Sequence, residues 1–315
     1  MNDKRLILVT GGAGFIGSSL VEALIEDPSH YVVIADNLKT GSKNKLPLAK
    51  HNNLKFIQCD VNDLDQITSV FHTFPFEYVF HYAALVGVQR TLQNPVMVLD
   101  DIKGIRNILN LSKNTGVKRV MYASSSEVYG EPVEFPQNEE TTPLNSRLPY
   151  AIVKNVGEAF LKSYYQEFGL EYTIFRFFNT YGPKQSKDFV ISKFINAAMK
   201  NEDITVYGDG SQTRTFCFVN NNVDACINAA FSDAYANETL NIGSDIETPI
   251  LDLAQLIIRL TGSSSKIEHL PPLPEGDMTR RKPDITKMKA LLNGSMISLE
   301  DGIQTILKDP SYILS

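Results

Sequence analysis

The chain has 315 residues, 43% of them hydrophobic and 21% charged, with a formal net charge of −6. This length suits two domains, and the mixed charges argue against a nucleic-acid partner. The three cysteines are scattered, which argues against a disulfide framework. The five histidines are scattered too, so the sequence predicts no metal site. The N-terminus does not resemble a signal peptide and no apolar run reaches the ~20 residues of a membrane span, so we expect a cytoplasmic protein without a membrane partner.

The first half of the chain alternates apolar runs that suit buried strands with segments of helical periodicity. The strand-like runs are residues 5–10, 30–37, 54–61, 78–84 and 119–126, and the helix-like segments include residues 15–27 and 100–116. Strands that alternate with helices are typical of a parallel sheet covered on both faces. We therefore predict an α/β fold with a Rossmann-type doubly wound parallel sheet.

The character of the sequence changes from about Asn179. The strand-like runs become shorter, Gly, Pro and Asn are more frequent, and residues 268–278 form a proline-rich stretch. This pattern predicts a smaller C-terminal α/β domain that binds the substrate. The predicted first domain comprises residues 1–178 plus about 215–243, and the predicted second domain comprises residues 179–214 plus 244–315.

The glycine-rich segment "VTGGAGFIG" lies between the first strand and the first helix. Gly12, Gly14 and Gly17 fit the pattern GxGxxG, and Gly11, Gly14 and Gly17 fit GxxGxxG. Glycines here let the backbone approach a pyrophosphate at the N-terminus of a helix. Asp36 ends the second strand, where an acid accepts hydrogen bonds from both ribose hydroxyls and repels a 2′-phosphate. The segment therefore predicts a dinucleotide site that prefers NAD to NADP.

The segment "PYAIVKN" places Tyr150 and Lys154 four residues apart in a stretch of helical periodicity. At this spacing the two side chains share one face of a helix. A nearby ammonium group lowers the pKa of a tyrosine hydroxyl, and the phenolate can then remove a proton from an alcohol. Together with the dinucleotide site, the pair predicts oxidation of a hydroxyl group.

Motifs along most of the chain resemble one family. They are "TGGAGFIG", "ADN" at Asp36, "CDV" at Asp60, "FHYAA" at 80–84, "SSSEVYG", "YAIVK", "RFFNTYGP" at 176–183, "GDGSQTRTF" at 208–216 and "RRKPDITK" at 280–287. In this order they resemble the extended short-chain dehydrogenase/reductases that act as NAD-dependent nucleotide-sugar epimerases, dehydratases and decarboxylases.

The resemblance implies a role for each matching residue. Tyr150 would be the base, Lys154 would orient it and bind the nicotinamide ribose, and Ser125 would hold the C4 hydroxyl of a sugar that is oxidised to a 4-keto species. The residues implied to bind NAD are Gly11, Gly14, Phe15, Ile16, Gly17, Asp36, Asn37, Asp60, Val61, Ala83, Ala84, Tyr150, Lys154 and Phe177. Those implied to bind the nucleotide sugar are Ser125, Ser126, Asn179, Arg214 and Arg281.

Glu127 bears on the net reaction. A strand has a period of two residues, so we expect Ser125 and Glu127 to point to the same side, with Glu127 as a catalytic acid or base near C5 or as a structural residue. Ser126 stands where 4,6-dehydratases carry an acid, which disfavours dehydration. The pair Ser126–Glu127 resembles UDP-glucuronate decarboxylases, but Phe189 replaces the arginine of those enzymes, and residues 85–95 resemble epimerases instead.

Asp101 is a second departure, because the family usually has an asparagine at this position. We expect its charge to act on Tyr150 or Lys154. The resemblance also implies a homodimer whose interface is a four-helix bundle, formed by the helices around 95–115 and 150–168 of each chain.

The predicted function is an NAD-dependent enzyme that oxidises C4 of a nucleotide-linked sugar, with 4-epimerisation as the net result. The alternatives are a UDP-glucuronate decarboxylase, a 4-dehydrogenase or 4,6-dehydratase that releases a 4-keto sugar, and, from a different class, a non-catalytic NAD sensor.

Overall fold

The computed structural model describes residues 4–48, 51–87, 91, 93–271 and 280–309. The predicted proline-rich stretch at 268–278 and the epimerase-like segment at 85–95 lie partly outside these residues. The chain divides into two compact units. Unit 1 comprises Met1–Gly130, Leu144–Phe177 and Val223–Leu240, and unit 2 comprises Glu131–Pro143, Phe178–Asn222 and Asn241–Ser315.

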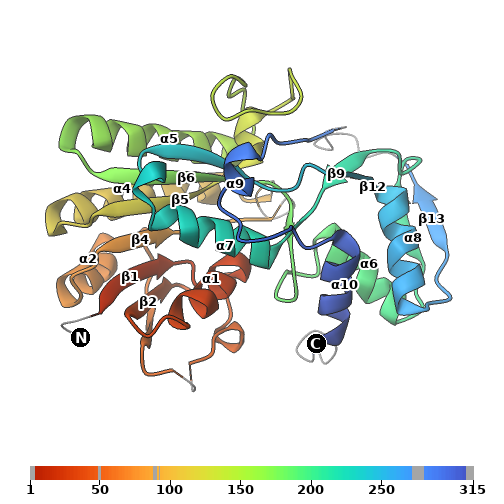
Figure 1. Ribbon diagram of the computed structural model, residues 1–315, viewed down its shortest axis with the longest axis horizontal. Coiled ribbons are helices and arrows are strands. Elements are labelled where there is room, and N and C mark those ends of the chain that lie inside the picture. The colour runs from red at the N-terminus through yellow and green to blue at the C-terminus, as the bar shows by residue number, and fades with distance from the viewer. Residues whose placement is uncertain (1–3, 49–50, 88–90, 92, 272–279, 310–315) are drawn as a thin grey trace. The chain divides into compact units, whose positions relative to one another are not determined.

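Unit 1 is built around a seven-stranded sheet with the strand order β11-β6-β5-β4-β1-β2-β3 (Figure 1). Its strands are β1 (Arg5–Thr10), β2 (His30–Asp36), β3 (Leu54–Gln58), β4 (Tyr78–His81), β5 (Arg119–Ser125), β6 (Glu171–Phe177) and β11 (Glu238–Ile242). The first six strands all pair in parallel. The strand order reverses between β1 and β4, which is the position where doubly wound sheets bind their ligands. The predicted Rossmann-type fold is confirmed.

Helices of unit 1 cover this sheet. They are α1 (Phe15–Ile25), α2 (Leu64–Thr73), α4 (Pro95–Thr115), α5 (Pro149–Phe168) and α7 (Val219–Ala230), whose first residues belong to unit 2. On one side, α4 packs against both α2 and α5 (Figure 1). The strands β4 and β5 are buried over their whole length, because a parallel sheet between two helical layers has no solvent-facing side.

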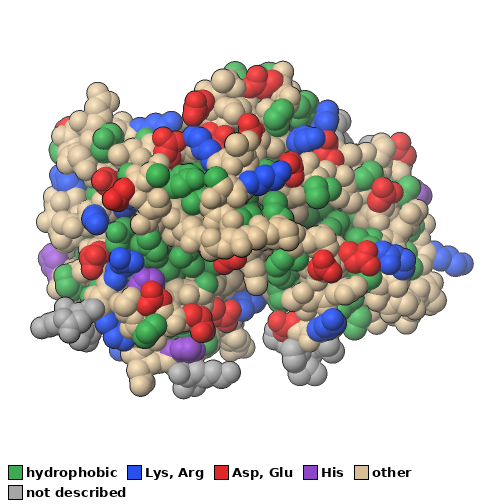
Figure 2. Space-filling view, viewed as in Figure 1, with side chains coloured by type: hydrophobic (Ala, Val, Ile, Leu, Met, Phe, Trp, Pro, Cys, Tyr) green, Lys and Arg blue, Asp and Glu red, His purple; other side chains and the backbone are tan. Residues whose placement is uncertain are grey.

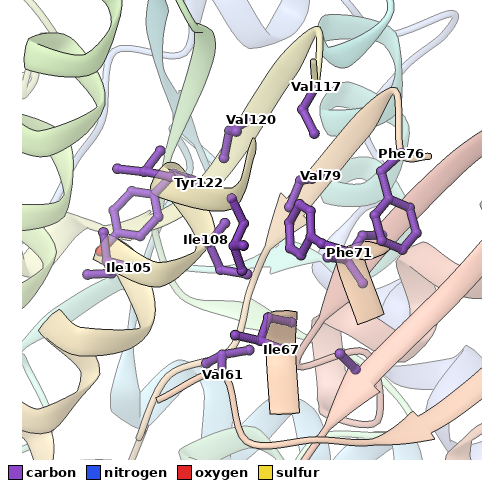
Figure 3. Close-up of a cluster of buried hydrophobic side chains, with 14 of the residues drawn as sticks. Val61, Ile67, Phe71, Phe76, Val79, Ile105, Ile108, Val117, Val120 and Tyr122 are labelled. Atoms are coloured by element: carbon purple, nitrogen blue, oxygen red, sulfur yellow. The ribbon is translucent and has the colours of Figure 1, made fainter. Parts of the chain in front are cut away.

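One large part of the core of unit 1 lies between the sheet and helices α2, α4 and α5. Figure 3 shows Tyr122 of β5 beside Ile105 and Ile108 of α4, with Val79 and Phe71 farther along the same layer. This apolar packing sets the distance between the helices and the sheet. It therefore also sets the positions of the side chains that these helices carry near the ends of the strands.

Unit 2 contains short strands that pair two by two. They are β7 (Thr180–Tyr181) with β10 (Cys217–Phe218), β9 (Thr213–Thr215) with β12 (Glu247–Pro249), and β8 (Ile204–Tyr207) with β13 (Ile267–Leu270). The helices are α6 (Val190–Met199), α8 (Ile250–Thr261), α9 (Thr286–Lys289) and α10 (Leu299–Lys308). A separate core, to which α6, α8 and α10 contribute Ile195, Leu253 and Ile303, holds these elements together.

The surface carries both signs of charge, and Figure 2 shows Lys and Arg interspersed with Asp and Glu on the face in view. Among the described residues no helix is both long and apolar enough to cross a membrane. The cytoplasmic location stays a prediction.

Candidate active site

The glycine-rich turn joins β1 to α1 at the point where the sheet order reverses. Gly11 has a φ of +69°, in the left-handed region that favours glycine. A Cβ on Gly11 would lie 2.6 Å from the backbone nitrogen of Ala83, just past the end of β4. A Cβ on Gly17 would lie 2.3 Å from the carbonyl oxygen of Gly11. Only residues without a side chain allow this close approach of turn, helix and neighbouring strand end.

The N-terminus of α1 has the features of an anion site. The helix begins after Gly14, no side chain caps it, and its first turn carries no acidic residue. Phe15, Ile16 and Gly17 form the first turn, where backbone N–H groups and the helix dipole favour negative charge. This arrangement fits the pyrophosphate of a dinucleotide.

Asp36 is buried at the end of β2, and backbone groups orient its carboxylate. One oxygen accepts a hydrogen bond from the backbone N–H of Ala13 at 3.0 Å, and the other accepts one from Leu38 at 2.7 Å. Each carboxylate oxygen can accept more than one hydrogen bond, so the group retains capacity for ribose hydroxyls. The position beside the glycine turn is the one that the sequence spacing predicts.

Asp60 follows β3 and belongs to a polar cluster. Partial burial acts to raise its pKa, but hydrogen bonds from the Asn62 backbone and from Asn37, together with the Lys39 ammonium, hold that pKa below its ordinary value. The side-chain nitrogen of Asn37 lies 3.0 Å from the carboxylate, and that of Lys39 lies 3.3 Å from it. Val61 packs in the core, and its carbonyl oxygen accepts a hydrogen bond from Asn107.

The end of β4 is tied to the end of β1. The Thr10 hydroxyl lies 2.8 Å from Nδ1 of His81 and accepts a hydrogen bond from the backbone N–H of Ala83 at 3.2 Å. Burial, and then the nearby Lys154 ammonium, lower the pKa of His81 to about 3, so the ring is neutral at pH 7. Ala83 and Ala84 are half-buried beyond this strand end.

Phe177 ends β6. Its ring packs edge to face against Tyr82, with the ring centroids 5.6 Å apart. This contact places the predicted NAD-contacting Phe177 near the end of β4, which precedes Ala83 and Ala84.

Ser125 is the last residue of β5, and Ser126–Tyr129 form a 3-10 helix. The Ser125 hydroxyl accepts a hydrogen bond from the backbone N–H of Glu127 at 3.2 Å and so caps this short helix. The strand ends before Glu127, so strand periodicity does not set the direction of the Glu127 side chain. Even so, the negative charge of Glu127 acts on the Tyr150 hydroxyl, which places both residues in one local environment. Ser126 is buried.

Tyr150 lies in the first turn of α5, close enough to Ser125 for that side chain to act on the pKa of the Tyr150 hydroxyl. Burial raises the pKa of Tyr150; the Ser125 hydrogen bond opposes this rise, and the charges of Glu127 and Asp101 add to it. The sequence-based expectation of a lowered pKa is therefore not met in the protein alone. The structure brings Ser125 and Tyr150 together, as predicted.

Lys154 is buried one turn further along α5. Its ammonium donates a hydrogen bond to the carbonyl oxygen of Ala123 at 2.6 Å and lies 5.7 Å from the centre of the Tyr150 ring. Burial lowers the pKa of Lys154 to about 8, and the charge of Asp101 acts in the opposite direction. An ammonium group has three donors, so two remain for a ligand.

Asp101 lies in α4, with one carboxylate oxygen accepting a hydrogen bond from the backbone N–H of Leu85 at 2.7 Å. Burial raises the pKa of Asp101, while the Leu85 hydrogen bond and the Lys154 ammonium act to lower it. Its charge acts on both Lys154 and Tyr150, as the sequence comparison with the family suggested.

We expect Asp101→Asn to move the whole pH–activity profile to lower pH, by about one unit for the loss of one neighbouring charge. The amide oxygen can keep the Leu85 hydrogen bond. Without the negative charge the pKa values of Lys154 and Tyr150 both fall, so both limbs of the profile move to lower pH. The measurement is kcat/KM against pH.

Asp100→Asn is the matched control, because Asp100 precedes Asp101 in α4 but pairs with the exposed Lys103 at 2.9 Å. Its profile should coincide with that of the unmodified protein. An unmoved profile in Asp101→Asn would contradict the assigned electrostatic role.

A buried polar network lies beneath these residues, and sequence analysis missed it. The guanidinium of Arg176 donates two hydrogen bonds to the Glu158 carboxylate, at 2.9 and 2.7 Å, and a third to the Tyr129 hydroxyl at 2.8 Å. Ser124 donates to the same carboxylate at 2.6 Å. The network joins β5, α5, β6 and the 3-10 helix that carries Glu127. Glu158 could have been noticed, because it lies four residues after Lys154 on the same face of α5.

Gly157 is the point of closest approach between α5 and β5. A Cβ on this residue would lie 2.2 Å from the hydroxyl of Tyr122. The ring of Tyr122 lies under the Lys154 ammonium, 5.1 Å from its centre. The helix that carries Tyr150 and Lys154 therefore rests directly on the strand that ends in Ser125.

The predicted substrate residues Asn179, Arg214 and Arg281 all belong to unit 2. Asn179 donates a side-chain hydrogen bond to the carbonyl oxygen of Thr215 at 3.2 Å. Arg214 lies in β9, and Arg281 is buried in the segment before α9. Phe189, at the position where decarboxylases have an arginine, precedes α6 and is exposed.

The sheet order and the glycine turn define a dinucleotide-binding α/β fold, and known proteins specify the family. Residues 7–243 match the model of the NAD dependent epimerase/dehydratase family. The UDP-N-acetyl-alpha-D-glucosaminuronate decarboxylase of Bacillus cytotoxicus is 38% identical over 97% of this chain and 97% of its own length. The chain belongs to the NAD dependent epimerase/dehydratase family.

Solved structures agree with this assignment. The UDP-glucose 4-epimerase of Thermotoga maritima, solved with UDP-glucose, is 32% identical with a TM-score of 0.90, over 98% of this chain and 99% of that one. The UDP-glucose 4-epimerase of Thermus thermophilus, solved with NAD, is 28% identical with a TM-score of 0.87, over 96% and 98%. The cofactor is NAD, and the uncapped α1 terminus and the oriented Asp36 carboxylate of this chain fit it.

Proposed function

We propose that this protein oxidises C4 of a nucleotide-linked sugar and that its net reaction is 4-epimerisation. The observation that carries the proposal is that Tyr150 and Lys154 of α5 lie beside the carboxyl end of β5. The Lys154 ammonium donates to the carbonyl oxygen of Ala123, and the Ser125 side chain acts on the Tyr150 hydroxyl. A hydroxyl pair of this kind can hold a sugar hydroxyl and remove its proton.

Each of the three residues has a role in this proposal. Ser125 holds the C4 hydroxyl, and Tyr150 takes its proton and later returns it. Lys154 supplies the positive charge that favours the phenolate, with its ammonium oriented by the carbonyl oxygen of Ala123. Bound NAD would supply the acceptor for the hydride of C4 and, once reduced, the hydride that returns. For inversion at C4 the sugar must present its other face when the hydride returns.

The remaining site residues have roles by the same proposal. The glycine turn, Asp36, Asn37 and Asp60 hold the adenosine half of NAD. Asn179, Arg214 and Arg281 bind the diphosphate of the nucleotide sugar, because a guanidinium group donates two parallel hydrogen bonds to phosphate oxygens.

Decarboxylation is the second candidate, and two observations favour it. The Bacillus cytotoxicus decarboxylase is closely similar over nearly the full chain. The charge of Glu127 also acts in the environment of Tyr150, where a carboxylate could return a proton to C5 after carbon dioxide leaves. Phe189 favours epimerisation over decarboxylation, because a phenyl ring cannot form an ion pair with the carboxylate of a decarboxylase substrate.

The deciding experiment incubates the purified protein with UDP-, GDP-, dTDP- and CDP-linked sugars, including UDP-glucuronate, and follows the products by mass and NMR. A product of unchanged mass with inverted C4 supports epimerisation. Loss of carbon dioxide, water or two hydrogens would instead assign a decarboxylase, a dehydratase or a dehydrogenase. NAD binding without any turnover would favour the NAD sensor.

We also propose that two chains associate through α4 and α5 of each. These helices pack against each other, and both carry exposed apolar side chains, among them Val96 and Leu99 in α4 and Ile152, Tyr165 and Phe168 in α5. Exposed apolar side chains gathered on two neighbouring helices favour burial against a partner. Sedimentation equilibrium should give the mass of two chains, and the mass of one chain would contradict the proposal.

A further inference from the structure

Glu247 in unit 2 is the common partner of several groups. Its carboxylate accepts hydrogen bonds from Nε and Nη2 of Arg280 at 2.6 and 2.7 Å, and from the Thr213 hydroxyl at 3.2 Å. The Lys282 ammonium lies 3.7 Å from it. The Arg280 hydrogen bonds lower the pKa of Glu247, with the Lys282 charge acting in the same direction, so the carboxylate stays charged near neutral pH.

The strand pairing relates Glu247 to Arg214. Strand β12 pairs antiparallel with β9, and Thr248 is directly opposite Arg214. Side chains alternate between the two sides of such a ribbon. Glu247 and Thr213 therefore share one side, while Arg214 projects from the other.

The segment that contains Arg281 is held by backbone pairing at Pro283, which forms an isolated parallel bridge with Gln137. The backbone N–H of Gln137 donates to the carbonyl oxygen of Lys282 at 2.7 Å. The backbone N–H of Asp284 in turn donates to the carbonyl oxygen of Gln137 at 2.8 Å. Arg280 and Lys282 both reach Glu247, so in an extended segment the intervening Arg281 points the opposite way. Arg281 is only 8% exposed, which agrees with this inward direction.

We propose that Glu247 is a positioning residue for Arg214 and Arg281, the two arginines to which the proposed function assigns the diphosphate of the nucleotide sugar. By holding the flanking Arg280 and Lys282, the carboxylate fixes the direction of Arg281 and fastens its segment to β9, which carries Arg214. The cluster then presents two guanidinium groups for a ligand with two phosphates. Glu247 itself does not touch the substrate.

The test is Glu247→Gln in the NAD-loaded protein, with calorimetric titration of UDP and of inorganic pyrophosphate. We expect about tenfold weaker binding of both, the effect of losing hydrogen bonds between charged groups that orient a binding residue. The KM for the nucleotide sugar should rise, and kcat at saturation should stay unchanged. If Glu247 were only a negative charge near the phosphates, its removal would tighten binding, so an unchanged or tighter Kd overturns the proposal.

Glu300→Gln is the matched control, because Glu300 also accepts two hydrogen bonds from one arginine of unit 2, Arg259, at 3.2 and 2.9 Å. It should leave UDP binding unchanged. Arg280→Lys keeps the charge and loses the paired hydrogen bonds, so it should weaken UDP binding as well and serves if Glu247→Gln does not fold. Failure of the unmodified protein to bind UDP or any other nucleoside diphosphate would overturn the proposed function and this inference together.

Discussion

Replacement of Tyr150 with phenylalanine is expected to lower the rate of sugar oxidation by roughly 10²- to 10⁴-fold, the usual contribution of a positioned acid or base. The phenyl ring keeps the packing at the start of α5 but cannot exchange a proton with the C4 hydroxyl. Ser125 also loses the neighbouring hydroxyl on which its side chain acts. The measurement is single-turnover reduction of bound NAD, followed by absorbance, with the nucleotide sugar that proves active.

Tyr164→Phe is the matched control for this change. Tyr164 lies on the same helix, and its hydroxyl donates a hydrogen bond to Asn110 at 2.7 Å, far along α5 from the start of the helix. It should leave the rate within a factor of about two, since the lost bond contributes only about 1 kcal/mol to folding. Full activity in Tyr150→Phe would remove the proposed base, and unchanged biological function without turnover would favour the NAD sensor.

Glu158→Gln is expected to cost about 3–5 kcal/mol in the free energy of unfolding of unit 1, because it leaves the Arg176 guanidinium buried without a counter-charge. Both side chains are 2% exposed, so water cannot replace the lost partner. Denaturant unfolding followed by circular dichroism measures the effect. If the two units unfold in separate steps, only the step of unit 1 should move to lower denaturant.

Two further variants separate the charge from the packing. Glu158→Gln combined with Arg176→Gln should be less destabilised than Glu158→Gln alone, because no unpaired charge remains in the core. Glu300→Gln breaks an exposed ion pair and should change stability by about 0–1 kcal/mol. A loss below about 1 kcal/mol for Glu158→Gln would mean that solvent reaches Arg176 and that the network does not hold the 3-10 helix in place.

The fold could be predicted because its determinants are local. Continuous apolar runs such as residues 5–10 and 119–125 become strands buried on both faces, and the helical segments between them impose parallel pairing. The glycine turn and Asp36 were also accessible, since close backbone approach and an oriented acid follow from fixed spacings. The roles given to the site residues stay predictions.

The parts that failed depend on side-chain contacts and burial, which no spacing in the sequence reveals. Strand periodicity did not apply to Glu127, because the Ser125 side chain caps the following turn and ends the strand one residue earlier than assumed. The expectation that the pKa of Tyr150 is lowered took the positive charge of Lys154 into account but not the burial of the hydroxyl, which raises the pKa. The Glu158–Arg176 pair spans 18 positions and the Glu247–Arg280 pair spans 33, and neither separation leaves a periodic pattern.

The contact of Gly157 with Tyr122 affects how a mutational survey of this enzyme should be interpreted. Gly157 lies seven residues after Tyr150, two turns along the same face of α5, so an added methyl group requires Tyr122 or α5 itself to shift. A substitution there is expected to lower turnover by displacing Tyr150 and Lys154, without removing either side chain. A mutational screen that measures only lost turnover would therefore count Gly157 among the catalytic residues. Measuring cofactor retention in parallel would prevent this error.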